Sequence, residues 1–366
     1  MIPPLHRVRI LDLTRVLAGP LCTMTLGDLG ADVLKVERKG EGDETRAWGP
    51  PFDGTGESAY YLSVNRNKLG IALDLDAEDD RLLLHRLIAG ADVVVDNFRP
   101  GMLERRGLDP LRLLAVHPRL LWCTLTGFGP GSTRPGYDFV VQAESGWMAI
   151  TGEPDGDPMK SGMPLADVIA GKDAAIQILA ALAAPERPEA PADRRLTVSL
   201  SHSATAALVN VAQNTIVTGE EPARWGNAHP NLVPYQLFDT ADRPIVIAVG
   251  NDAQWRSCCM ALDRADLADT TAYATNPGRV TAREQVVAEL SRTLLERSAL
   301  EWLGRLAQHG VPAGIVRPVR EALAEVRSDA RSGIAPVPPG AVRRPPPRLD
   351  EHGDLIRRLG WRAFEA

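Results

Sequence analysis

The sequence predicts an α/β protein with a parallel sheet in its first half and a smaller α+β region after it. Short apolar segments alternate with segments of helical character between Val8 and Thr126, which is typical of strand–helix–strand units. Near Glu220 the pattern changes to a hairpin followed by helices. The chain has 366 residues, which is long enough for two domains.

The first strand–helix–strand unit lies at the start of the chain. Val8–Leu13 is an apolar run, and Pro20 suits the first position of a helix that continues to about Leu29. Gly30 suits the end of that helix, and a second strand follows at Asp32–Glu37. A crossover of this kind joins parallel strands.

The pattern then repeats and predicts a Rossmann-like parallel sheet. The further predicted elements are a strand at Gly70–Leu75, a helix at Ala77–Ala89, a strand at Asp92–Asp96, a short helix after Pro100, a helix at Pro110–Val116, and strands at Leu120–Thr126 and Arg195–Leu200. The long polar loop Gly40–Asn67 interrupts the series, and a loop of this length in a compact domain usually serves function.

The second half of the chain predicts a different architecture. Tyr235–Asp239 and Pro244–Val249 read as a hairpin, and Ser201–Thr218 before them reads as one buried helix. Helices are expected after Gly250, near Arg279–Glu296 and at Ala299–Gln308. The predicted domains are residues 1–220 (large, Rossmann-like), 221–330 (small, α+β) and 331–366, a proline-rich return arm with a C-terminal helix that rejoins the large domain.

Composition and charge narrow the classes of function. The formal net charge of -6 disfavours nucleic-acid and membrane-surface binding. No apolar run is long enough to suggest a membrane span, and the N-terminus lacks the apolar core of a signal peptide, so we expect a cytoplasmic protein. The four cysteines and the scattered histidines lack metal-ligand spacing, which predicts buried reduced thiols and no metal site.

One carboxylate opens the most apolar helix. The stretch Met163–Lys172 places Asp167 at the start of a helix that continues into an alanine-rich segment ending near Ala184. Asp167 could cap the helix, because aspartate accepts hydrogen bonds from free backbone N–H groups at that position. It could instead be a nucleophile, because carboxylates fill that role in covalent catalysis. In either case, a place at the helix start favours the ionised form.

Basic residues follow several predicted strands. They are Arg15 after the first strand, Arg38 and Lys39 after the second, and Arg99, Arg105 and Arg106 after the fourth. Ligands of open parallel sheets bind at these strand ends, and arginine suits phosphate groups. A glycine-rich dinucleotide fingerprint is missing from the turn around Ala18–Pro20, which disfavours an NADP-dependent oxidoreductase.

Five spaced motifs stand out along the chain: Arg15–Pro20, Gly30–Glu37, Asp96–Gly101, Gly136–Asp138 and Asn227–Asn231. Together they resemble class III coenzyme A (CoA) transferases, the CaiB/BaiF family that includes formyl-CoA transferase, carnitine CoA-transferase and α-methylacyl-CoA racemases. The resemblance runs from about Val8 to Trp361. It implies two chains threaded through one another as an interlocked, ring-like homodimer.

The resemblance also implies the site. Asp167 matches the catalytic aspartate of the family. The residues that match positions along the CoA groove are Leu17, Ala18, Arg38, Leu73, Asn97, Phe98, Arg105 and Tyr137, and Arg99 belongs to the same strand-end group. The implied reaction moves CoA from an acyl-CoA to a carboxylic acid through a mixed anhydride and an aspartyl-CoA thioester. It needs no permanently bound cofactor and no nucleic-acid or membrane partner.

Two other functions stay open. An α-methylacyl-CoA racemase or epimerase is disfavoured because Tyr137 stands where the racemases carry a histidine base. A CoA-ester-binding protein without turnover would leave Asp167 with a structural role. Within the transferases, Leu17 and the single glycine of Val249–Gln254 depart from the polar residue and the glycine-rich lid of formyl-CoA transferase, which disfavours oxalate and formyl specificity.

Overall fold

The structure, a computed structural model, describes residues 2–366 and divides the chain into two compact units. The sheet unit comprises the chain up to Met148 together with Lys160–Glu221 and Val326–Ala366. The small unit comprises Ala149–Met159 and Pro222–Glu325. The chain therefore leaves the sheet unit twice and returns to it twice.

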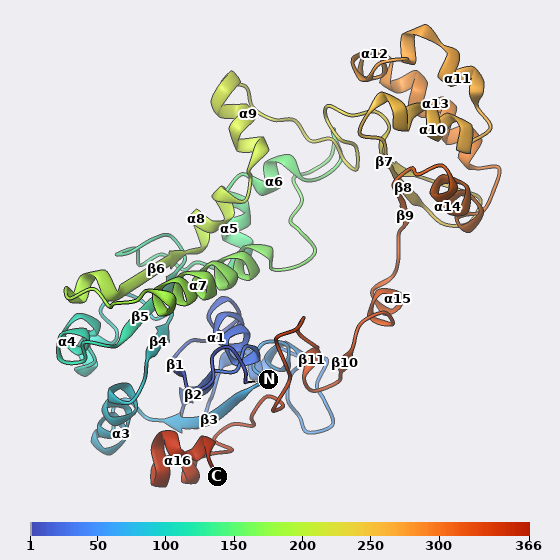
Figure 1. Cartoon of the computed structure of the whole chain (residues 1–366). Helices are drawn as coiled ribbons and strands as arrows, with labels where there is room; N and C mark the ends of the chain where they lie inside the picture. Colours follow the sequence, from blue (N-terminus) through green and yellow to red (C-terminus); the bar gives the residue numbers. More distant parts are fainter. Residues whose placement is uncertain (1) are drawn as a thin grey trace. The chain divides into compact units, whose positions relative to one another are not determined.

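A six-stranded, fully parallel sheet forms the centre of the sheet unit (Figure 1). Its strands are β1 (Arg9–Asp12), β2 (Asp32–Arg38), β3 (Lys68–Leu73), β4 (Val93–Asp96), β5 (Leu121–Thr126) and β6 (Arg195–Ser199), in the order β3-β2-β1-β4-β5-β6. The predicted α/β class with a Rossmann-like parallel sheet is confirmed. The strand order reverses between β1 and β4, and this switch point is where ligands of such sheets bind.

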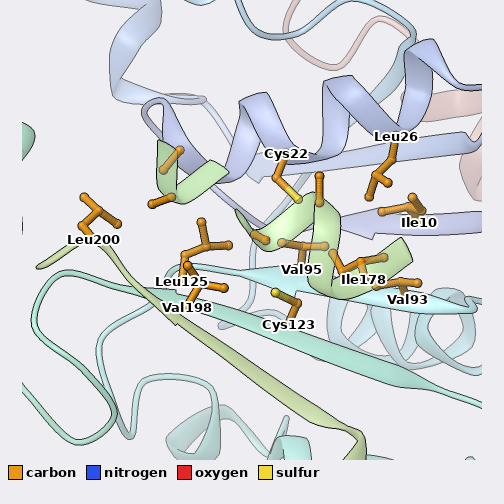
Figure 2. Close-up of a cluster of buried hydrophobic side chains, with 14 of the residues drawn as sticks. Ile10, Cys22, Leu26, Val93, Val95, Cys123, Leu125, Ile178, Val198 and Leu200 are labelled. Carbon is orange, nitrogen blue, oxygen red and sulfur yellow. The ribbon is translucent and has the colours of Figure 1, made fainter. Parts of the chain in front are cut away.

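One face of the sheet packs against α1 (Ala18–Asp28) and α7 (Leu165–Ala183). Figure 2 shows Cys22 and Leu26 of α1, Val93 and Val95 of β4 and Ile178 of α7 within this cluster of buried side chains. Because successive side chains of a strand alternate between faces, Ile10 of β1 joins this core and Leu11 joins the opposite one.

The opposite face is covered by α3 (Glu78–Ala89), α4 (Pro110–Val116) and α16 (Gly353–Leu359). The last of these belongs to the C-terminal segment, which lies beside β3 in Figure 1. The other elements of the unit are η1 (Glu44–Ala47), α2 (Ala59–Leu62), η2 (Glu104–Arg106), α5 (Asp138–Glu144), α6 (Trp147–Ile150, at the unit boundary), η3 (Pro191–Arg194), α8 (Leu200–Ala206), α9 (Asn210–Thr218), β10 (Ser328–Asp329), β11 (Gly333–Ile334) and η5 (Gly360–Phe364).

The single buried helix predicted at Ser201–Thr218 is wrong in two respects. The chain forms α8 and α9, which are separated at Val209, where φ is 43°. No residue of α9 is buried, and Ile216 and Val217 are exposed. A β-branched residue with positive φ breaks a helix without the glycine or proline that would have signalled the break in the sequence.

The small unit combines an antiparallel sheet with helices. The sheet has the order β7-β8-β9, and helices α10 to α14 pack on it through a core that includes Trp255 and Trp302. The elements are β7 (Tyr235–Phe238), β8 (Ile245–Ala248), α10 (Asp252–Ala261), α11 (Ala265–Asp269), η4 (Thr271–Tyr273), α12 (Asn276–Thr281), α13 (Arg283–Leu294), α14 (Ala299–Gln308), β9 (Ala313–Ile315) and α15 (Val319–Leu323). The hairpin is confirmed, whereas the helix predicted near Arg279–Glu296 is divided between α12 and α13.

The structure also bears on cysteine pairing, membrane-spanning helices and metal sites. All four cysteines are unpaired and buried, and their burial was predicted. Within residues 2–366, no helix is long and apolar enough to cross a membrane. Over the same residues, no group of three or more histidine, cysteine and acidic side chains is arranged to hold a metal ion.

Candidate active site

A cavity of about 270 Å³ lies at the switch point of the sheet. Its walls are the turn after β1, the segment after β4, the end of β5 and the loop that leads to Tyr137, and Asp167 of α7 also lines it. We call it the Asp167 cavity. Its charged lining residues are Arg15, Glu44, Arg99, Arg134 and Asp167.

Asp167 is the third residue of α7 and does not cap it. Pro164 occupies the cap position and provides no side-chain hydrogen bond. Instead, Oδ1 of Asp138 accepts hydrogen bonds from the N–H groups of Ala166 at 2.8 Å and Asp167 at 3.2 Å. The cap interpretation of Asp167 is therefore wrong, because a carboxylate from α5 fills that role.

The Asp167 carboxylate is buried and has no hydrogen-bond donor among the residues that the structure describes. Its residue is 8% exposed. Burial, and secondly the negative charge of Asp138, raise the pKa of Asp167 from 3.8 to about 7. The position at the helix start was expected to favour ionisation, but desolvation and the neighbouring charge outweigh that effect. The lone pairs of the carboxylate remain free for a bound molecule.

The turn after β1 forms one wall of the cavity. Val16 has φ 71°, which is unusual for a β-branched residue, and its N–H donates to Oδ1 of Asp43 at 3.3 Å. On one side of it, the side-chain amide of Asn97 accepts from the N–H of Arg15 at 3.0 Å and donates to the carbonyl of Arg15 at 2.8 Å. On the other side, Leu17 and Ala18 enter α1 and are buried. Side chains from two other segments therefore fix this turn.

Buried ion pairs stabilise the same turn after β1. Lys35 donates to the carbonyl of Thr14 at 2.9 Å and pairs with Asp43 at 3.1 Å. Lys68 pairs with Asp12 at 2.9 Å, and both side chains are fully buried. Burial alone would raise the pKa of Asp12, but Lys68 and Lys35 outweigh it and lower that pKa. Since an unpaired buried charge is costly, this network holds the strand ends in place.

A second cavity, of about 230 Å³, lies along the ends of β1, β2 and β3. We call it the Arg38 cavity. Arg15, Phe98 and Met102 line both cavities, so the two are neighbours, and the Arg15 guanidinium lies over the Phe98 ring at 5.7 Å. Arg38 is exposed and pairs with Glu41 at 2.8 Å. An extended ligand with phosphate groups that occupied both cavities would lie near the guanidinium groups of Arg15 and Arg38.

The structure brings most of the predicted site residues together. Those that line the Asp167 cavity are Leu17, Ala18, Asn97, Phe98, Arg99, Tyr137 and Asp167. Arg38 and Leu73 line the Arg38 cavity. Arg105 lies outside both cavities, and the adjacent Arg106 lines the second one. The amide of Asn97 is already engaged with the backbone of Arg15, so it shapes the cavity wall.

The sequence did not indicate the residues that hold the cavity-lining segments in place by hydrogen bonds. Asp138 belongs to the Gly136–Asp138 motif, and Asp43 lies in the long polar loop, but neither was assigned a role. Gln142, one helical turn after Asp138, was missed as well. The spacing of Asp138 and Gln142 by four residues is a usable signal, because such residues share one face of a helix.

Comparisons with known proteins agree with this geometry. The sequence matches the model of CoA-transferase family III over residues 5–358. It is 39% identical to a succinate–glutarate CoA-transferase of Agrobacterium fabrum, over 96% of this chain and 94% of that protein. It is 40% identical to the succinyl-CoA:glutarate CoA-transferase of Homo sapiens, over 96% of this chain and 84% of that protein.

A solved structure supports the same relationship. A CAIB/BAIF family protein from Brucella suis superposes with a TM-score of 0.85 at 37% sequence identity, covering 98% of this chain and 99% of that chain. The similarity thus extends over both units and is not limited to the parallel sheet, which many unrelated proteins share.

Proposed function

Because the chain belongs to CoA-transferase family III, we propose that it moves CoA between carboxylic acids with Asp167 as the nucleophile. The observation that carries the proposal is the state of the Asp167 carboxylate. It is buried, has no hydrogen-bond donor among residues 2–366, and lines a cavity at the switch point of the sheet. A carboxylate with a structural role would instead be hydrogen-bonded.

The proposed chemistry balances without a redox step. An Asp167 oxygen attacks the thioester carbonyl of the donor, the C–S bond breaks, and CoA leaves as a thiolate, which yields a mixed anhydride. The thiolate then attacks the Asp167 carbonyl and releases the donor acid, which leaves an aspartyl-CoA thioester. The carboxylate of the acceptor repeats these two steps in reverse and leaves with CoA. The intermediates react with water, so burial of Asp167 protects them.

We assign the two cavities to the two ends of CoA. The thioester end would lie against Leu17, Ala18 and Tyr137 beside Asp167. The nucleotide end would lie in the Arg38 cavity, where the exposed Arg38 guanidinium suits a phosphate. The residues that line both cavities, Arg15, Phe98 and Met102, would then contact the part of CoA between its two ends.

We further propose short dicarboxylic acids as the acyl groups. The two relatives described above are named for succinate and glutarate, which are dicarboxylates. The Asp167 cavity offers three arginines, Arg15, Arg99 and Arg134, to the second carboxylate of such an acid. Arg134 pairs with Glu144 at 2.5 Å, whereas the buried Nε of Arg15 has no acceptor among residues 2–366. Arg15 is therefore the better placed of these two to accept a new anion.

The homodimer and the division into domains at residues 220 and 330 are also proposals. The apolar surface of α9 supports the dimer, since Ile216 and Val217 are exposed on a helix with no buried residue. Apolar side chains gathered in this way commonly mark a protein interface.

Mass spectrometry of reaction mixtures tests the activity. Succinyl-CoA or glutaryl-CoA is incubated with a panel of mono- and dicarboxylates, and new acyl-CoA species are identified by mass. We expect transfer to dicarboxylates and much weaker transfer to acetate or butyrate. A parallel incubation of 2-methylacyl-CoA in deuterium oxide tests the racemase alternative. Among the residues that line the Asp167 cavity there is no histidine, so we expect no deuterium at the α-carbon.

A further inference from the structure

The start of α7 is held by α5. Besides the N–H groups of Ala166 and Asp167, Asp138 also binds Gln142, whose Nε2 donates to Oδ2 of Asp138 at 2.6 Å. The three donors use both oxygens of the Asp138 carboxylate. Asp138 is the first residue of α5, so this contact ties the first turns of two helices together.

Gln142 extends the contact to the segment that leads into α7. Its Oε1 accepts from the N–H of Ser161 at 2.8 Å, and its Nε2 also lies 3.4 Å from the carbonyl of Met163. Gln142 is fully buried. The segment it holds contains Met163, which is itself exposed, so little apolar packing fixes this part of the chain. Polar contacts to α5 therefore hold the segment that leads into α7.

We infer that Asp138 and Gln142 are positioning residues that set the place of the Asp167 carboxylate in the cavity, and this inference rests on the proposed function of Asp167. The backbone N–H groups of Ala166 and Asp167 donate to Asp138, which fixes the backbone of Asp167 and leaves its side chain free. An Asp167 side chain that capped its own helix would have its oxygens occupied by N–H groups. Because Asp138 of α5 provides the cap, the carboxylate oxygens of Asp167 are not occupied by backbone N–H groups.

The arrangement also fixes the charge near Asp167. The ionisable groups that interact with it are Asp138 from α5 and Tyr60 from α2, and Arg15, Glu44, Arg99 and Arg134 line the same cavity. The Asp138 charge adds to burial in raising the pKa of Asp167. Burial, and secondly the charges of Asp167 and Asp138, raise the pKa of Tyr60 to about 12, which keeps its hydroxyl protonated. Removal of the Asp138 charge should therefore change the titration of Asp167 even where the fold is intact.

Three variants separate the contributions, and a fourth serves as control. Asp138→Ala removes the cap and the charge, and Asp138→Asn retains an acceptor for the two N–H groups but removes the charge. Gln142→Met leaves the cap and the charge in place but removes the hydrogen bonds of Gln142 to Asp138, Ser161 and Met163. The control is Asp173→Asn on the same helix, because Asp173 accepts one hydrogen bond from Ser203 at 2.6 Å and lies outside the Asp167 cavity.

Steady-state kinetics give the first readout. We expect Asp138→Ala to lower kcat by about 10–100-fold with little change in the KM for the acyl-CoA, since small displacements of a reacting group have effects of this size. Asp138→Asn should recover most of that loss. Gln142→Met should lower kcat less than Asp138→Ala, and Asp173→Asn should behave as wild type.

The second readout needs no substrate. Carbodiimide labelling of the peptide that contains Asp167, followed by mass spectrometry, reports the pH at which this carboxyl group loses its proton. We expect a midpoint near 7 in the wild type and in Asp173→Asn, and a lower midpoint in Asp138→Asn. A purely structural role for Asp138 would not move this midpoint.

Two results would overturn the inference. One is a wild-type kcat in both Asp138 variants; the other is an unchanged labelling midpoint in Asp138→Asn. Should Asp138→Ala fail to fold, Asp138→Asn and Gln142→Met carry the test. Failure of the proposed function would be recognised by a different result. In that case the Asp167→Asn variant would still transfer CoA, whatever the Asp138 variants do.

Discussion

The Asp167 carboxylate has a property that a helix cap would lack, a pKa raised from 3.8 to about 7. Only the ionised form can attack a thioester. We therefore predict that kcat/KM for the acyl-CoA rises with pH and levels off above about pH 7. Initial rates at low acyl-CoA concentration between about pH 5.5 and pH 9 give the profile. A profile that is flat across pH 7, or falls there, would contradict this prediction.

The raised pKa of Asp167 also affects the stability of the folded protein. Because the pKa of Asp167 is higher in the folded state than in the unfolded state, its ionisation favours unfolding. This cost is absent below about pH 4, grows as pH rises, and is complete above about pH 7. At about 1.4 kcal/mol for each pKa unit, the full cost is about 4 kcal/mol as an order of magnitude.

Asp167→Asn should remove this cost. We predict that the variant unfolds several degrees above the wild type at pH 8, and that the difference shrinks towards pH 5. Calorimetry at the two pH values measures it, and Asp173→Asn controls for the loss of one negative charge on α7. A variant less stable than the wild type at pH 8 would show that burial does not oppose ionisation at this position.

At the scale of elements, the approach of α7 to α1 determines the width of the cavity. Gly171 of α7 faces the start of α1 so closely that an added Cβ would lie 2.5 Å from the carbonyl oxygen of Ala18. Ala18 lines the cavity that Asp167 also lines. Any side chain at position 171 must therefore move one cavity wall relative to the other.

We predict that Gly171→Ala lowers stability by about 1–3 kcal/mol and reduces kcat, although alanine is the better helix former. The matched control is Gly304→Ala in the interior of α14, where an added Cβ would meet no atom within 4 Å. There the same exchange should add about 0.5–1 kcal/mol of stability. Denaturant unfolding measures the free energy of unfolding of both variants. An equal gain in stability in Gly171→Ala and Gly304→Ala would contradict the close packing of α7 on α1.

The elements of the sheet were predictable from sequence because parallel strands are buried on both faces. β4 is an uninterrupted apolar run up to Asp96, and the observed limits of β2 and β4 lie within one residue of the predicted ones. The helix Pro110–Val116 was also predicted correctly, since Asp109 caps it and proline occupies its first turn. Breaks within helices were not predictable, because the positive φ of Val209 depends on packing and has no sequence signal.

The site was predictable only in part. Residues that line the cavities sit at strand ends or at a helix start, and both places follow from the order of elements. The partners that hold them come from distant segments, as in the contacts of Asn97 with Arg15 and of Asp138 with α7. Sequence spacing does not indicate such pairs. The raised pKa of Asp167 could not be foreseen for the same reason, since it depends on burial and on Asp138.

At the scale of the whole molecule, long-range contacts tie the C-terminal arm to the loop that precedes β3. Arg66 pairs with Asp28 at 2.7 Å and donates to the carbonyls of Ser332 and Ile334. Tyr61 donates to the carbonyl of Pro347 at 3.0 Å. The arm therefore belongs to the sheet unit, although the small unit separates it in sequence from the strands.

We predict that the protein is a homodimer that does not dissociate on dilution. An interlocked pair cannot separate while both chains stay folded, and the exposed apolar side chains of α9 would be covered in it. Light scattering coupled to size exclusion, repeated from micromolar to nanomolar concentration, measures the mass. A folded monomer at low concentration would refute the interlocked dimer and leave the surface of α9 unexplained.

In the proposed reaction, Asp167 becomes covalently bound to the acyl group and then to CoA. Incubation of the protein with an acyl-CoA and no acceptor, trapping with hydroxylamine, and sequencing of the peptides by mass spectrometry detect this bond. We predict a hydroxamate on Asp167 in the wild type, and none in Asp167→Asn or in wild type without acyl-CoA. Unmodified Asp167 in protein that transfers CoA, or near-normal transfer by Asp167→Asn, would contradict the account.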